Sequence, residues 1–118
     1  MAITKSSSSF QASATNTAGS TTTGSSVDLT GKYGCSVTLK VTNGGTGPTV
    51  GCDARIEVSN DNSDWWEVFR ATAGVANSGV YIWMVDLPAS ILYARSVFGG
   101  NTAQSVTVEA DGHVITAV

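Results

Sequence analysis

The densest group of side chains that could bind a ligand is the Asn/Asp-rich run that ends at two adjacent tryptophans. Asn60, Asn62 and Asp64 have the alternate spacing of the first ligands in a calcium-binding EF-hand loop. That loop needs Gly at its sixth position and a bidentate Glu at its twelfth, where this sequence has Trp65 and Ala71. The run is therefore not expected to be a calcium loop.

Two other interpretations of this run remain open. Asn and Asp tolerate left-handed backbone and cap nearby amides, so the run is typical of a hairpin tip. The two tryptophans that follow must point to opposite faces of the next strand, and the outward one could stack on a sugar or lie in a protein interface. The candidate glycan or interface contacts are Asn60, Asp61, Asn62, Trp65 and Trp66.

Catalytic groupings are sparse. The only histidine, His113, follows the dipeptide Asp111-Gly112, which predicts a two-residue hairpin turn, so a Ser/His/Asp arrangement would depend on a turn residue. Carboxylates such as Asp61 and Glu67 have nothing apolar around them to raise a pKa for acid catalysis. The sequence predicts no catalytic residue, no metal site and no cofactor, and hence a protein that is not an enzyme.

Cys35 and Cys52 are the only cysteines. If their strands pair as a hairpin around "NGGTGPT", the residue opposite Cys52 is near Val41, and Cys35 lies about 20 Å along the ladder. Both cysteines are therefore expected to remain thiols, as is usual in a reducing compartment.

Composition excludes several partners. Charged residues make up 13% of the 118-residue chain, about half the usual ~25%, and the net charge is −3. The six Lys and Arg are scattered and give no basic stripe for nucleic acid. The start of the sequence has no apolar run, so we expect no secretory signal, no membrane segment and synthesis in a cytoplasm.

Residues 1–26 are dominated by Ser and Thr, with little that is apolar beyond Ile3 and Phe10. This composition predicts an N-terminal arm that is either flexible or becomes ordered on assembly against a neighbouring subunit, with Ile3 and Phe10 as its contacts.

From residue 27 onward, apolar and polar residues alternate with period two in several short segments. Residues 27–118 are therefore predicted to be one all-β domain, an antiparallel β-sandwich or jelly roll of about seven to nine strands. Segment 35–41 and segment 52–58 are expected to pair with each other. Segment 79–87, "GVYIWMVDL", is apolar on both faces, which indicates either a central strand or a strand with one face against another chain.

Three stretches carry a resemblance to known proteins. "IEVSNDNSDWWEV" is similar to the strand, S-x-D-G turn and tryptophan pattern of β-sandwich domains, including discoidin-like modules, with Asn62 where Gly is commoner. "LTGKYGCSVTLKVTNGGTGPT" and "LPASILYARSVFGGNT" resemble blocks of small tailed-bacteriophage virion proteins of the head decoration or cement type. Together these blocks cover most of residues 27–110.

The resemblance implies a non-enzymatic virion structural protein made in the host bacterial cytoplasm and bound to the exterior of the assembled phage head. It implies the major capsid protein as partner and a homo-oligomer, such as a trimer. The alternatives are a phage tail or baseplate subunit and a carbohydrate-binding β-sandwich module.

Overall fold

The computed structural model describes residues 2–118 and is built of strands in two antiparallel sheets, which confirms the predicted β-sandwich. The strands are β1 (Thr4–Asn16), β2 (Thr21–Thr23), β3 (Val27–Asp28), β4 (Cys35–Asn43), β5 (Asp53–Ser59), β6 (Trp66–Thr72), β7 (Val80–Leu87), β8 (Tyr93–Gly99) and β9 (Val106–Ala117). The described residues contain no helix that is long and apolar enough to cross a membrane.

The strand order is that of a jelly roll. Sheet A has the order β1-β9-β4-β7, and sheet B has the order β2-β8-β5-β6, with the short β3 also paired to β8. The pairs are nested along the chain: β1 with β9, β2 and β3 with β8, β4 with β7, and β5 with β6. A long hairpin rolled into two sheets gives this order.

The expected hairpin of segments 35–41 and 52–58 is wrong. Strand β4 pairs with β7 and β9 in sheet A, whereas β5 pairs with β6 and β8 in sheet B, so residues 44–52 cross from one sheet to the other. Alternation shows that each strand buries one face, but it does not identify the neighbouring strand. The core between the sheets is apolar, with Val37, Leu39, Val41, Ile56, Phe98 and Val108 fully buried.

The division of the chain at residue 26 also needs correction. Strand β1 pairs with β9 of the same chain from Thr4 to Asn16. Phe10 is 1% exposed in the core, and Ile3 is exposed just before the strand. Residues 4–16 are thus an edge strand of sheet A and not a separate arm, because one buried aromatic ring and the pairing with β9 offset the cost of ordering a Ser-rich segment.

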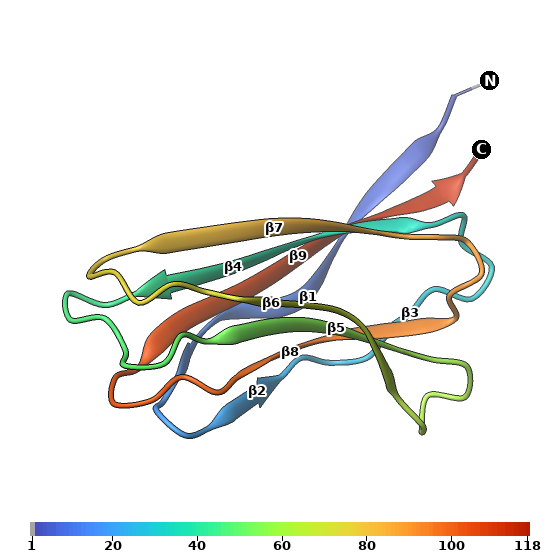
Figure 1. Cartoon of the computed structure of the whole chain (residues 1–118). Coiled ribbons are helices and arrows are strands. Elements are labelled where there is room, and N and C mark those ends of the chain that lie inside the picture. The colour runs from blue at the N-terminus through green and yellow to red at the C-terminus, as the bar shows by residue number, and fades with distance from the viewer. Residues whose placement is uncertain (1) are drawn as a thin grey trace.

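The predicted turn at Asp111-Gly112 is absent, because β9 continues straight through both residues. Gly112 lies opposite Ser8 on β1, and a Cβ added there would be 2.5 Å from Cε1 of Phe10. The glycine therefore makes room for an aromatic ring inside a strand. Figure 1 shows β1 and β9 running side by side to the end of the sandwich where both termini lie.

One long side of the sandwich is formed by β6 and β7. Strand β1 packs near β2 and β8, so the opposite edges of the two sheets, β7 and β6, share the other side. Residues 73–79 connect these two strands directly. Segment 80–87 is therefore an edge strand, and the prediction of a central strand is wrong.

Candidate functional site

The Asn/Asp run forms the tip of the β5–β6 hairpin, as one of the sequence interpretations predicted. The carboxylate of Asp61 accepts hydrogen bonds from the backbone amides of Asp64 and Ser63, at 2.8 and 2.9 Å, and from the hydroxyl of Ser59. These bonds, that of Asp64 first, lower the pKa of Asp61 to about 2. Asn62 has a positive φ of 61° and accepts a hydrogen bond from the hydroxyl of Ser26.

These contacts limit what the turn can bind. The carboxylate of Asp61 and the side-chain oxygen of Asn62 are both used inside the protein, while Asn60 is exposed. In residues 2–118, no three His, Cys, Asp or Glu side chains are grouped so that they could hold a metal ion. The turn is therefore a projection held by its own hydrogen bonds, and Asn60 is one of its exposed polar side chains.

The two tryptophans after the turn lie on opposite faces of sheet B. The guanidinium carbon of Arg95 lies 4.2 Å from the centroid of the Trp65 ring, and Arg95 also forms an ion pair of 2.8 Å with Glu57. Trp65 is thus covered by its own fold through a cation–π contact. Trp66 pairs with Val58, on the core side of the sheet, yet it remains 58% exposed because β6 is an edge strand.

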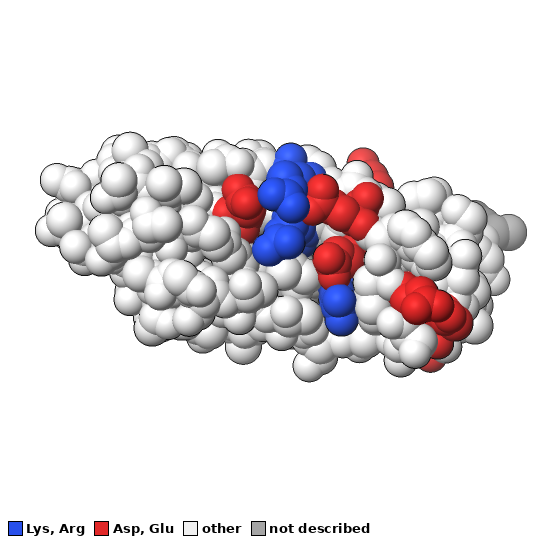
Figure 2. Space-filling model, turned by 60° about the horizontal axis from the view of Figure 1, so that its bottom comes forward, with Lys and Arg blue, Asp and Glu red and all other residues white. Residues whose placement is uncertain are grey.

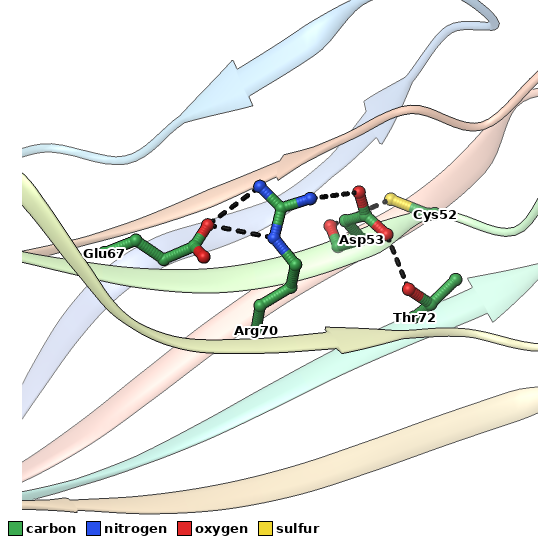
Figure 3. A network of polar contacts seen from close by, with 5 residues as sticks. All are labelled: Cys52, Asp53, Glu67, Arg70 and Thr72. Atoms are coloured by element: carbon green, nitrogen blue, oxygen red, sulfur yellow. Dashed lines mark hydrogen bonds and ion pairs between the residues drawn. The ribbon is translucent and has the colours of Figure 1, made fainter.

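The outer face of sheet B carries a band of charge. Figure 2 shows basic and acidic side chains side by side across the middle of one face of the molecule. Arg70 lies directly opposite Arg55 on the neighbouring strand, and two like charges in this position repel each other. Arg70 lies between two carboxylates, with Nη2 2.9 Å from Glu67 and Nη1 3.1 Å from Asp53 (Figure 3). These carboxylates offset the repulsion between the two arginines.

The β6–β7 side is apolar in contrast. Ten large hydrophobic side chains are exposed in residues 2–118, and six of them lie between positions 66 and 84: Trp66, Val68, Val75, Val80, Ile82 and Met84. A β-bulge leaves Val68 out of register and turns it to solvent, while the outward positions of β7 alternate with inward Tyr81, Trp83 and Val85. Clusters of this kind on a soluble protein mark binding surfaces.

Both cysteines are free and buried, as predicted. Burial raises the pKa of each thiol to about 11. The Sγ of Cys52 lies 3.5 Å from the backbone oxygen of Asp53 (Figure 3). Thiols with a raised pKa and little exposure are poor nucleophiles, so neither Cys35 nor Cys52 has the environment of a catalytic residue.

A hollow of about 660 Å³ lies at the end of sheet A where the termini leave the body. Its polar side chains come from four strands and include Lys5 of β1, Ser36 of β4, Asp86 of β7 and His113 of β9. The aromatic ring of Tyr33 forms part of its wall, together with Gly34, Cys35, Leu87 and Ile115. Tyr33 is 49% exposed.

His113 is in the middle of β9, paired with Ser36, and Ser36 is paired with Asp86. Within the described chain, no hydrogen bond joins these three side chains, and the order across the sheet places the serine between the other two. This row therefore lacks the Asp-His-Ser hydrogen-bond chain that activates a nucleophile. Sequence reasoning missed the hollow, because its residues are spread from position 5 to position 115 and only the jelly-roll pairing brings them together.

Comparisons with known proteins give the fold and not a family. No protein-family model matches the chain, and no curated protein matches it. Among solved structures, a chain of infectious bursal disease virus, Gx strain, superposes with a TM-score of 0.60 at 12% identity over 97% of this chain. This chain spans 32% of that viral chain, about a third of its length.

Two further structures share the fold. The SPBc2 prophage-derived protein YomS superposes with a TM-score of 0.55 at 14% identity and covers 98% of this chain and 96% of its own. The K3 cleaved adhesin domain of Lys-gingipain from Porphyromonas gingivalis W83 has a TM-score of 0.51 at 16% identity over 82% of this chain and 63% of its own. The sandwich described here is therefore one that occurs in viral, prophage-derived and adhesin chains.

Proposed function

We propose that this chain is a non-enzymatic structural protein of a phage particle that binds the outside of the assembled head as a decoration or cement protein. The observation that carries the proposal is the jelly-roll order, which accounts for almost the whole chain and superposes on a virus chain and on a prophage-derived protein of nearly equal length. The structures of that virus include a VP2 subviral particle. The sequence blocks that resemble phage decoration proteins support the same role.

The mechanism we propose is reinforcement by a rigid body. A rigid body is favoured over an arm that becomes ordered on assembly, because β1 pairs with β9 and contributes Phe10 to the core. The protein would instead bind the major capsid protein through preformed surfaces, including the turn tip at Asn60. Many symmetry-related weak contacts on one particle then combine into tight binding by multivalency.

Of the two tryptophans expected at an interface, Trp66 remains the candidate, since Trp65 is occupied by Arg95. A ring that is 58% exposed at the end of an apolar side is the kind of residue that anchors an interface. Asn60 and Asn62 complete this candidate contact as the projecting end of the hairpin.

Sedimentation with particles tests the proposal. Particles from the producing cell are first stripped of the bound chain and then mixed with the purified protein. The protein should sediment with the particles and saturate at a fixed number of copies per particle. Intact particles that contain none of this chain, and that bind none when it is added, would contradict the role. Detection of the chain only at the tail would favour the tail or baseplate alternative.

A carbohydrate-binding function is the second candidate, and the structure favours a place for it other than the tryptophan turn. The hollow beside Tyr33 combines an open aromatic ring with Lys5, Asp86 and His113, none of which forms an ion pair or side-chain hydrogen bond within residues 2–118. An aromatic face for a sugar ring, surrounded by polar groups for its hydroxyls, is the composition of a saccharide site.

A further inference from the structure

The strands at the edges of the two sheets differ in how well they are protected against pairing with another chain. Strand β1 is interrupted by three register shifts, β6 has a bulge, and β2 and β3 are three and two residues long. Bulges and shortness of this kind block the addition of a further strand. Strand β7 pairs with β4 in unbroken register from Val80 to Leu87, without Lys, Arg or Pro, and its only charged residue is Asp86 near the end.

The outward face of β7 is apolar as well as unprotected. Val80 is 52% exposed, Ile82 59% and Met84 71%. The next strands on the same face present polar side chains instead: Thr38, Lys40 and Thr42 on β4, then Thr107, Glu109 and Asp111 on β9. The apolar surface of sheet A is therefore confined to the edge strand, where another strand would add.

We propose that β7 pairs antiparallel with β7 of a second copy of this chain, about a two-fold axis at Ile82. This register places Ile82 opposite its own copy and Val80 opposite Met84 on the outer face. On the inner face it places Tyr81 opposite Trp83, an aromatic cross-strand pair. The two four-stranded sheets A then form one continuous eight-stranded sheet.

The charges along β7 are compatible with pairing to a second copy of the same strand. In this register no charged side chain stands opposite one of the same sign, because Asp86 falls opposite Ser78 and positions 80–85 carry no charge. The contact is self-complementary, as a two-fold interface must be. A partner recognised by charge would be expected to use the Arg and Glu band of sheet B instead.

A stable dimer must bury a minimum area, and this requirement indicates which surfaces the contact covers. Eight residues at about 3.3 Å each make the β7 edge roughly 26 Å long. A single strand of this length falls short of the ~800 Å² per partner of a standard interface. Strand β6 lies on the same side and adds the exposed Val68, so a stable contact must also cover part of the β6 edge.

The mass of the full chain in solution tests the proposal without any particle, so its outcome is independent of the virion role. Analytical ultracentrifugation should give twice the 12.1 kDa of the monomer. Ile82→Lys puts two like charges at the axis and should yield the monomer with unchanged circular dichroism. Thr107→Lys, at an exposed position on the same sheet face two strands away, should leave the dimer intact.

A cysteine at the axis provides a second, structural readout that does not depend on how the lysine variant folds. Ile82→Cys should form an intermolecular disulfide under mild oxidation, whereas Thr107→Cys should not, and the native thiols stay buried. A wild type that remains monomeric over the micromolar range would overturn the proposal. So would a trimer, or a dimer that Ile82→Cys fails to link.

Discussion

The ring of Phe10 lies against Gly112, which faces it from the neighbouring strand β9, and a Cβ at position 112 would come within 2.5 Å of that ring. This contact ties the Ser-rich N-terminal strand to the core. It also explains why an Asp-Gly pair, which usually forms a turn, continues as a strand here.

Loss of the Phe10 ring should destabilise the whole sandwich. Phe10→Ala leaves a cavity next to Gly112, and we expect a loss of about 3–5 kcal/mol in the free energy of unfolding, measured by urea denaturation. Ala12→Ser, at an exposed position of the same strand, is the matched control and should change little. A chain without residues 1–24 that retains a cooperative unfolding transition would show that β1 is dispensable.

The buried amides of Asn16 and Asn101 lock the β1–β2 turn to the β8–β9 connection. Asn16 donates to Asn101 at 2.6 Å, and Asn101 donates to the backbone oxygens of Asn16 and Gln104. Asn101→Ala leaves these buried groups unpaired and should cost about 1–3 kcal/mol of unfolding free energy. Asn60→Ala, at an exposed position, should stay within about 0.5 kcal/mol, and an equal effect of both substitutions would contradict this role.

The hairpin tip should open only at very low pH. The pKa of Asp61 is lowered from 3.8 to about 2 in the folded turn. The stabilisation by this carboxylate is therefore fully present above the unfolded value and is lost as the pH falls through about 2. Amide exchange and chemical shifts of Ser63 and Asp64, followed by NMR between pH 5 and pH 1.5, should change with this midpoint. A midpoint near the ordinary 3.8 would show that the hydrogen bonds do not hold the turn.

The two thiols should be unreactive in the folded protein. Burial raises the pKa of Cys35 and of Cys52 to about 11, so almost no thiolate is present at neutral pH. Ellman's reagent should label neither cysteine under native conditions and both after unfolding. Rapid labelling of the native protein at pH 7.5 would show that one of them is accessible.

The saccharide alternative depends on Tyr33. If the hollow binds glycans, Tyr33→Ala should abolish the signal on a glycan array, and Trp66→Ala should preserve it. The reverse result would return the site to the tryptophan turn. No binding of any glycan by the wild type at millimolar concentration would remove the carbohydrate function.

The sequence predicted the strands well because alternation depends on each strand's own buried face. It could not predict which strands pair with each other. Strands β4 and β5 have ideal alternation and a glycine-rich connection, yet they lie in different sheets. Local turn chemistry at Asp111-Gly112 was overridden by Phe10, a residue about a hundred positions away. The Ser- and Thr-rich composition of residues 1–26 also did not indicate that Phe10 is buried in the core and holds β1 in the sheet.

The candidate sites show the same limit. The Asn/Asp run was placed correctly at a hairpin tip, since that depends on nearby residues alone. Whether Trp65 or Trp66 is open depended on Arg95, which comes from β8. The hollow has no local signal, because Lys5, Tyr33, Asp86 and His113 meet only through the sheet pairing.

Electron cryomicroscopy of particles from the producing cell tests the central claim most directly. A decoration role predicts density for a β-sandwich of this size on the outer surface of the head, at symmetry-related positions and in contact with the major capsid protein. Density confined to the tail, or particles that lack the chain altogether, would contradict it.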